Sequence, residues 1–165
     1  MTQLPKKGPR VSAKALILRD GQVLTIRCID AAGPWYLLPG GGQDHMEPLE
    51  AALRRECREE VSVDVIVHGP VMLRDYIGKN HEFANEDGSF HQLEVMFLCE
   101  LAPGTEPSLG HSPDKTQDAA VWLPVAELHR HRIYPKKMIP RLQEIAREYA
   151  TGRRKFEAEY LGDAN

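Results

Sequence analysis

The sequence predicts an α/β fold in which a mixed β-sheet is covered by helices. Short runs of β-branched and other apolar residues recur along the chain, and such runs are typical of strands. Two longer segments instead carry apolar residues at the spacing of helical turns. The order along the chain is strands, one helix, more strands and a final helix. This order is typical of a layered sandwich of the α/β or α+β class.

Length, charge and cysteine content indicate the broad class of protein, a soluble chain with one domain. Its 165 residues, 42% hydrophobic and 27% charged, suit one soluble domain. We expect this domain over residues 1–152 and a C-terminal tail over residues 153–165. A net charge of −3 argues against non-specific binding to nucleic acid or to an anionic membrane. The first ten residues lack the apolar stretch of a signal peptide, and three widely spaced cysteines are expected to be reduced core thiols. These features predict a cytoplasmic protein.

The strands are expected on both sides of the first helix. An Asp-Gly pair at Asp20 and Gly21 separates two apolar runs, and this pattern favours a tight hairpin turn. Two polar segments, residues 78–89 and 102–117, predict long loops, and such loops often carry function. The strands are expected at residues 11–18, 22–29, 35–38, 63–67, 71–77, 93–101 and 119–123.

A closing helix is expected over residues 140–150. Its apolar residues recur at i, i+3, i+4 and i+7, and Gly152 follows as a stop signal. The stripe consists of Leu142, Ile145, Ala146 and Tyr149. The residues after it have few apolar side chains, so we expect them to fray or to join a partner.

The helix expected over residues 48–61 carries carboxylates within its apolar stripe. Leu49, Leu53, Cys57 and Val61 recur every four residues. At about 100° per residue, Glu56 and Glu60 fall in the middle of this stripe, and Glu59 lies close to it. Burying an unpaired carboxylate costs several kcal/mol. A hard divalent cation removes this cost, because carboxylate oxygens are the ligands that Mg²⁺ and Mn²⁺ prefer.

The alternative to a metal site is that the end of this helix faces solvent and that its glutamates form a solvent-exposed acidic face. The segment before the helix favours the metal site. Gly40, Gly41 and Gly42 allow a tight bend in which the backbone approaches a ligand closely. A glycine turn that leads into a helix with three glutamates is more specific than either feature alone.

Residues 41–63 resemble the Nudix box, whose pattern is G-x5-E-x7-R-E-U-x-E-E-x-G-U, where U is aliphatic. The chain departs from this pattern at Ser62, which replaces the late glycine, and at Cys57, which replaces an aliphatic residue. Many members also have glycine where this chain has Met46. All acidic positions are kept. The matching residues are Gly41, Glu47, Arg55, Glu56, Glu59, Glu60 and Val63.

The resemblance implies a Nudix-type α/β/α sandwich with a mixed sheet, and an enzyme that hydrolyses a nucleoside diphosphate linked to another moiety. It implies Mg²⁺ or Mn²⁺ as cofactor, bound by Glu56, Glu59, Glu60 and the Gly40 carbonyl. Arg55 and Glu47 are expected to orient these glutamates. The general base is expected to be Glu59 or Glu56. Acids outside the box that could also serve are Glu94, Glu106, Asp114 and Asp118.

The substrate class stays broad at the level of sequence. A small nucleotide such as ADP-ribose or a nucleoside triphosphate is favoured, because the net charge offers no wide surface for a polyanion. An RNA 5′ end is the one nucleic acid kept open, no membrane partner is expected, and a homodimer is open. Trp35 and Tyr36 could stack on a base or pack in the core. The alternative functions are a nucleotide-sensing Nudix-like domain without catalysis and a plain structural domain.

Overall fold

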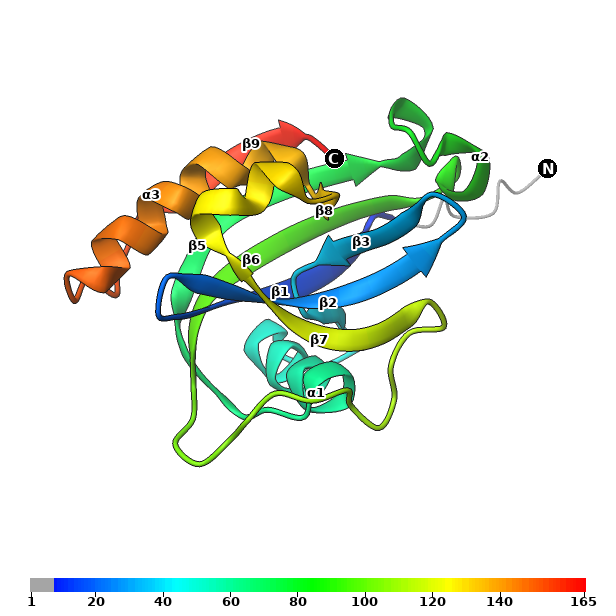
Figure 1. Cartoon of the computed structure of the whole chain (residues 1–165). Coiled ribbons are helices and arrows are strands. Elements are labelled where there is room, and N and C mark those ends of the chain that lie inside the picture. The colour runs from blue at the N-terminus through cyan, green and yellow to red at the C-terminus, as the bar shows by residue number, and fades with distance from the viewer. Residues whose placement is uncertain (1–7) are drawn as a thin grey trace.

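A computed structural model describes residues 8–165 as one mixed sheet with helices on both faces (Figure 1). Residues 1–7, on which most of the signal-peptide expectation falls, lie outside the described part. The main path of the sheet runs β8-β3-β2-β1-β6-β5-β9, with β4 paired to β1 and β7 paired to β2. Three pairs are parallel (β1 with β6, β3 with β8, β5 with β9) and the rest are antiparallel. The predicted fold class is therefore confirmed.

The strands agree with most of the predicted runs. The Asp20-Gly21 turn joins the first two, as expected. The strands are β1 Arg10–Arg19, β2 Gln22–Asp30, β3 Gly33–Leu37, β4 Gly40–Gly42, β5 Val65–Ile77, β6 His91–Leu101, β7 Gln117–Pro124, β8 Ile133–Tyr134 and β9 Glu159–Asp163.

Two long helices cover opposite faces of the sheet (Figure 1). Helix α1 spans Leu49–Val61 and helix α3 spans Ile139–Ala150. Shorter helical segments are η1 Gly78–Asn80, α2 Ala84–Asp87, η2 Val125–Arg130 and η3 Lys136–Met138. The first two of these lie in the expected loop 78–89.

Strand β1 shows how one strand serves two cores. Side chains alternate between the faces of a strand, so Leu16 and Leu18 join the core that contains Leu142 of α3. Ala15 and Ile17 join the core beneath α1. Both faces are buried, which explains why this run is almost continuously apolar.

Strand β5 differs from the prediction. The sequence predicted two strands separated by a break at Gly69-Pro70, but one strand runs through this pair. The register against β6 shifts on either side of it. Such shifts are β-bulges, which accommodate residues that a regular ladder excludes. The prediction of a break was wrong because a bulge and a strand end share the same local signal.

The segment after α3 also differs from the prediction that it frays or joins a partner. Residues 159–163 form β9, which pairs in parallel with β5. Its side chain Leu161 and the following Ala164 are buried in the core next to α3. Two buried apolar side chains are enough to hold the segment because its backbone also pairs with β5 at the edge of the sheet.

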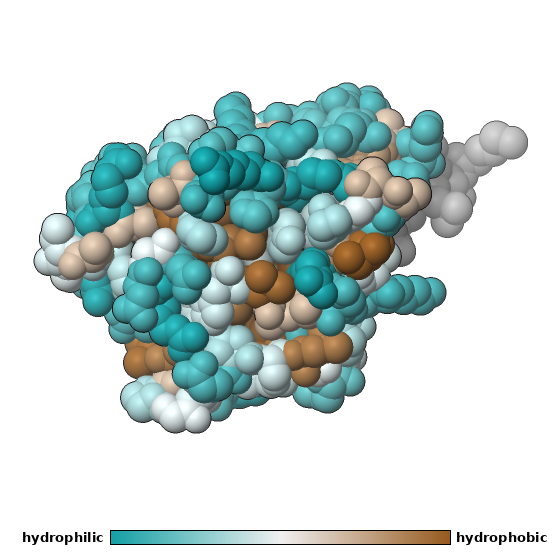
Figure 2. Space-filling view, in the orientation of Figure 1, coloured by the Kyte–Doolittle hydropathy of each residue, from teal (hydrophilic) through white to brown (hydrophobic). Residues whose placement is uncertain are grey.

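The polar character of the surface and the state of the cysteines agree with what the composition predicts. The face shown in Figure 2 is mainly hydrophilic, with hydrophobic side chains in small separate patches. From residue 8 onwards, no helix has both the length and the apolar character that crossing a bilayer requires. Cys28, Cys57 and Cys99 are free and buried, as predicted.

Helix α1 is bounded by two residues with left-handed backbone. Met46, before the helix, has φ of 64°, and Ser62, at its end, has φ of 58°. The amides of Ser62 and Val63 donate to the Arg58 and Cys57 carbonyls over 3.2 and 3.3 Å, an arrangement typical of a glycine-terminated helix. Both positions carry glycine in many Nudix boxes. The chain therefore keeps the glycine-type geometry without the glycines.

Replacing Ser62 with glycine is expected to raise the free energy of unfolding by about 0.5–1 kcal/mol. The left-handed conformation costs a residue with a Cβ about 1–2 kcal/mol, and the greater flexibility of unfolded glycine cancels part of the gain. Chemical denaturation measures the change. The matched control is Ser89→Gly, another exposed serine whose φ is not positive, where no gain is expected. Equal stability of the two variants would contradict the strain at Ser62.

Candidate active site

The acidic face of α1 lies against the glycine strand β4. Glu60 is 3% exposed, and the Gly40 amide donates a hydrogen bond to its Oε2 over 2.8 Å. Burial raises the pKa of Glu60 to about 7, opposed by the charge of Lys14 and by the Gly40 hydrogen bond. The helical angle therefore placed Glu60 correctly in the buried stripe.

Arg55 lies at the centre of the acidic cluster. Its Nε and Nη2 atoms donate to the two carboxylate oxygens of Glu47, each over 3.0 Å. Its Nη1 atom donates to Glu56 over 2.8 Å and to Glu59 over 3.4 Å. The hydrogen bonds that Arg55 donates to Glu47 and Glu56 raise the pKa of Arg55, and Arg55 lowers the pKa of Glu47. Arg55 thus contacts all three glutamates directly, whereas Glu47 is connected with Glu56 and Glu59 through Arg55.

The glycine triplet lets the carboxylate of Glu56 approach the backbone. A Cβ atom at Gly41 would lie 2.6 Å from that carboxylate, which is closer than any real contact. Gly40 has φ of 131°, and a Cβ there would collide with the Ala13 carbonyl. The triplet pairs with β1 as a short strand, so its glycines are required by close packing rather than by a loop.

The loop between β6 and β7 fixes the end of α1. The amides of Ser108, Gly110 and Ser112 donate to the carbonyls of Val61, Glu60 and Glu59 over 3.1, 2.9 and 3.1 Å. The Gln117 side chain also donates to the Glu60 carbonyl over 2.9 Å. These bonds satisfy the carbonyls that a helix end leaves unpaired. The sequence predicted the loop but gave no sign of this role.

The Gly40 carbonyl, predicted to bind metal, accepts a hydrogen bond from Lys14 Nζ. Glu56 and Glu59 face Arg55, and Glu60 faces the Gly40 amide. Within residues 8–165, no group of three or more His, Cys, Asp or Glu side chains is arranged to hold a metal ion.

The residues present still fit a hard divalent cation by their chemistry. They offer carboxylate and carbonyl oxygens, which are the preferred donors of Mg²⁺ and Mn²⁺. Glu60 is buried, and no cationic side chain of the described residues hydrogen-bonds to its carboxylate. The space above Gly41 is kept clear for the carboxylate of Glu56. A cation would be a counter-charge for the buried carboxylate of Glu60.

The acids outside the box differ in their surroundings. Glu106 and Asp118 are paired with surface arginines, Arg19 and Arg27. Asp114 is exposed, although its charge adds to the raised pKa of Glu60. Glu94 is buried and accepts a hydrogen bond from Arg74 over 2.5 Å. Glu94 is therefore a buried acid with a cationic partner.

A cavity of about 510 Å³ adjoins this site through Lys14, which both lines it and contacts the Gly40 carbonyl. Its polar floor includes Arg74, Gln92 and Glu94. Its aromatic lining consists of Trp35, Tyr76, Phe83, Phe90 and Tyr134. Sequence reasoning missed most of this cavity. One signal was present: Arg74 and Glu94 interrupt two apolar runs and face each other in the β5–β6 register.

Trp35 and Tyr36 have different surroundings. Trp35 lines the large cavity. Stacking on a base therefore stays a prediction for this residue. Tyr36 packs against the core next to α3 and edge-on to His131, with ring centres 5.5 Å apart. Tyr36 is thus a half-buried residue at the margin of that core.

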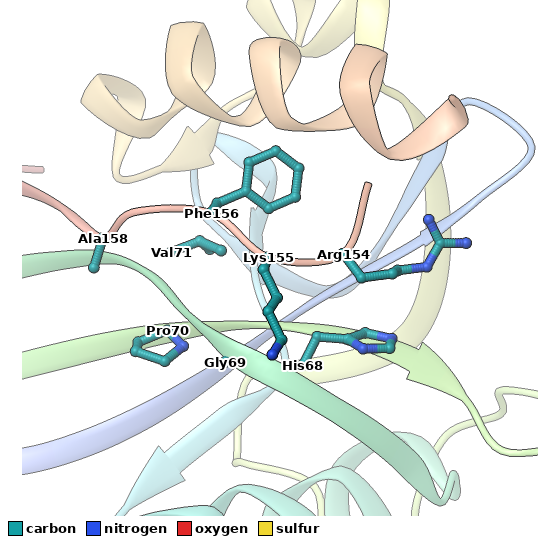
Figure 3. A pocket seen from close by; sticks show the side chains of 8 residues that line it. All are labelled: His68, Gly69, Pro70, Val71, Arg154, Lys155, Phe156 and Ala158. Atoms are coloured by element: carbon teal, nitrogen blue, oxygen red, sulfur yellow. The ribbon is translucent and has the colours of Figure 1, made fainter. Parts of the chain in front are cut away.

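A second cavity of about 230 Å³ lies away from the acidic helix (Figure 3). It is bounded by the bulged part of β5, including His68 and Pro70, and by residues 154–158. None of its lining residues belongs to the Nudix-like segment. The larger cavity is therefore the one connected with the site chemistry.

The family model of the NUDIX domain matches residues 8–142, so the chain belongs to the Nudix family. It is a Nudix hydrolase, an enzyme that acts on acid anhydrides.

Solved structures agree with this assignment. A MutT NUDIX hydrolase from Burkholderia pseudomallei is 28% identical with a TM-score of 0.57, covering 73% of this chain and 86% of that one. A NUDIX hydrolase from Nitrosomonas europaea is 16% identical with a TM-score of 0.69, covering 96% and 81%. An ADP-ribose pyrophosphatase from Streptococcus suis is 22% identical with a TM-score of 0.63, covering 93% and 99%. The last two show the likeness of the fold. No curated protein matches the chain.

Proposed function

We propose that the chain hydrolyses the pyrophosphate bond of a nucleoside diphosphate linked to another moiety, with Mg²⁺ or Mn²⁺ held by Glu56, Glu59, Glu60 and the Gly40 carbonyl. The observation that carries this proposal is the burial of the Glu60 carboxylate beside Glu56 on one helix face. A buried carboxylate that lacks a cationic partner costs several kcal/mol. A divalent cation would remove this cost.

The residues around the site have separate tasks in this proposal. When bound, the cation would neutralise charge on the pyrophosphate and make a water molecule a stronger nucleophile. Glu59 is the general base that we favour, because its side chain is 32% exposed and that of Glu56 is 15% exposed. Arg55 holds both carboxylates, and Glu47 holds Arg55. The ammonium of Lys14 lies where phosphate oxygens would pass from the cavity to the acidic helix.

A small nucleotide is the substrate that the cavity supports best. Its volume of about 510 Å³ lies within the usual range for small-molecule sites, and its aromatic lining suits a nucleoside. ADP-ribose and nucleoside triphosphates are therefore the first substrates to examine. One structural neighbour is named as an ADP-ribose pyrophosphatase.

The test is hydrolysis of ADP-ribose, nucleoside triphosphates, dinucleoside polyphosphates and a 5′-triphosphate RNA in Mg²⁺, Mn²⁺ or EDTA. We expect turnover of a small nucleotide with either metal, none in EDTA, and a loss of about 100-fold or more in Glu60→Gln, because the loss of a metal ligand removes several kcal/mol of stabilisation. Equal activity of Glu60→Gln and the parent would contradict the metal-ligand assignment. Binding without turnover in the parent would favour a sensing domain.

A further inference from the structure

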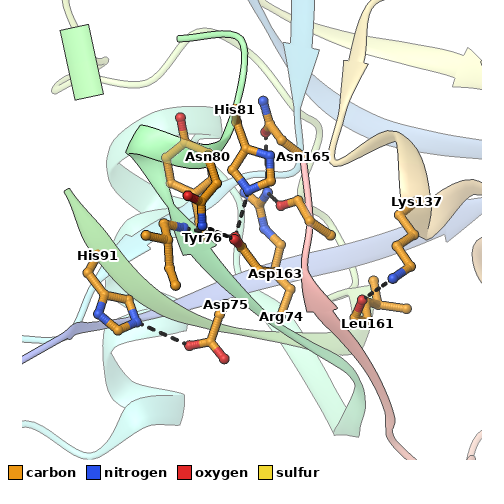
Figure 4. Close-up of polar contacts among 12 residues, drawn as sticks. Arg74, Asp75, Tyr76, Asn80, His81, His91, Lys137, Leu161, Asp163 and Asn165 are labelled. Atoms are coloured by element: carbon orange, nitrogen blue, oxygen red, sulfur yellow. Dashed lines mark hydrogen bonds and ion pairs between the residues drawn. The ribbon is translucent and has the colours of Figure 1, made fainter. Parts of the chain in front are cut away.

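The strand β9 is anchored beside the large cavity. The Ala164 amide donates to the Asp75 carbonyl over 3.1 Å, and Lys137 Nζ donates to the Leu161 carbonyl over 2.5 Å (Figure 4). Leu161 and Ala164 are each 4% exposed. The backbone that follows β9 is therefore held in one place by the sheet and by the core.

Asp163 connects β9 with residues 77–83, a segment that reaches the cavity. Its carboxylate accepts hydrogen bonds from the Ile77 amide over 3.0 Å and from Asn80 Nδ2 over 2.7 Å. It also contacts His81 Nε2 at 2.6 Å (Figure 4). Burial opposes ionisation of Asp163, but these hydrogen bonds outweigh it and lower its pKa to about 2. The same segment continues to Phe83, which lines the cavity.

Arg74 sets the orientation of the Asn165 amide. The Arg74 Nη1 atom donates to the Ala164 carbonyl over 2.5 Å and to Asn165 Oδ1 over 3.3 Å. A guanidinium group has only donors, so the amide oxygen must face it. The amide nitrogen of Asn165 then faces away, and it has no hydrogen-bond partner among residues 8–165.

The residue that carries this amide belongs to the wall of the large cavity. Asn165 lines it together with Gln92, Glu94 and Trp35, and the indole nitrogen of Trp35 likewise has no partner within the described residues. Each unpaired buried donor favours a ligand that brings an acceptor. Carbonyl oxygens and ring nitrogens on a flat heterocycle, framed by aromatic side chains, supply acceptors of this kind.

We infer that Asn165 is a specificity-determining residue that donates a hydrogen bond to the nucleobase of the substrate, and that β9 and Arg74 are its positioning elements. This inference rests on the proposed function, since it assigns the nucleoside part of the substrate to the cavity. The diphosphate then lies towards Lys14 and the acidic helix. Residues after α3, which the family model does not match, thus complete the binding site.

Binding of ADP, GDP, CDP, UDP and inorganic pyrophosphate in EDTA, measured by calorimetry, tests the inference without catalysis. We expect at least one nucleoside diphosphate to bind. Asn165→Ala should weaken that binding about tenfold, the scale of one hydrogen bond, and leave the affinity for pyrophosphate unchanged. Asn165→Asp, which replaces the donor with an acceptor at the same size, should weaken it further. Asn85→Ala, at an exposed position outside the cavity, is the matched control and should bind like the parent.

Three outcomes would overturn the inference: no binding of any nucleoside diphosphate, equal binding by Asn165→Ala and the parent, or an equal loss for pyrophosphate. Thermal unfolding of both Asn165 variants shows whether β9 stays in place. If the parent binds a nucleoside diphosphate through Asn165 but hydrolyses no nucleotide with Mg²⁺ or Mn²⁺, the proposed function fails and the inference stands.

Discussion

Replacing Glu59 with glutamine is expected to lower kcat by about 10³-fold with little change in stability. The amide keeps the size of the side chain but carries no charge, so it can neither accept the proton of the attacking water nor bind a divalent cation strongly. General-base catalysis contributes about 10²–10⁴-fold, and weaker cation binding adds to the loss. Steady-state kinetics on the best substrate of the nucleotide panel measures the effect.

The matched control for this variant is Glu50→Gln. Glu50 lies on the same helix but is exposed and lies outside the cluster held by Arg55. Its replacement should leave kcat within about twofold, because exposed substitutions away from a site have small effects. An activity of Glu59→Gln similar to that of Glu50→Gln would remove Glu59 from the catalytic residues and leave Glu56 as the base to examine.

Replacing Arg74 with methionine is expected to lower the free energy of unfolding by about 3–5 kcal/mol. Arg74 and Glu94 form a buried ion pair with side-chain exposures of 6% and 4%. Removing one member leaves the other charge buried and uncompensated. After the change, Gln92 Nε2, at 3.2 Å, would be the one remaining donor to Glu94 within residues 8–165. Chemical denaturation measures the loss.

Two further variants separate this explanation from a general effect of removing an arginine. Arg58 pairs with Asp64 at the surface, with side-chain exposures of 59% and 52%, so Arg58→Met should cost less than about 1 kcal/mol. The double variant Arg74→Met/Glu94→Leu should recover much of the lost stability, because no buried charge is left. Equal losses of unfolding free energy in Arg74→Met and Arg58→Met would show that the buried pair stabilises the fold no more than the exposed pair does.

Local sequence patterns were enough to predict the acidic face of α1. The helix was expected over residues 48–61 and spans Leu49–Val61. Helical periodicity is a local property, so the angle between Leu53 and Glu60 could be calculated without knowledge of the partner strands. The family spacing then joined Arg55 and Glu47 to the cluster, and the contacts of Arg55 agree with that grouping.

The cavity could not be predicted in the same way. Its walls come from strands far apart in the sequence, and their meeting depends on strand order and register. Strand β9 shows the difficulty most clearly, because its parallel pairing with β5 leaves no turn signal and only Leu161 enters the core from it. Asn165 reaches the cavity because that pairing brings the following residues next to Arg74. Nothing in the nearby sequence indicates this position.

The reactivity of the three cysteines can distinguish local unfolding on one side of the sheet from local unfolding on the other. All three belong to the core beneath α1, and none belongs to the core next to α3. Burial raises the pKa of the Cys57 thiol to about 12 and also raises those of Cys28 and Cys99. The thiolate is the form of cysteine that attacks a thiol-modifying reagent, so the folded chain is protected at all three positions. The rate of modification therefore reports loosening of the layer that contains the acidic helix α1, and it does not respond to local opening under α3.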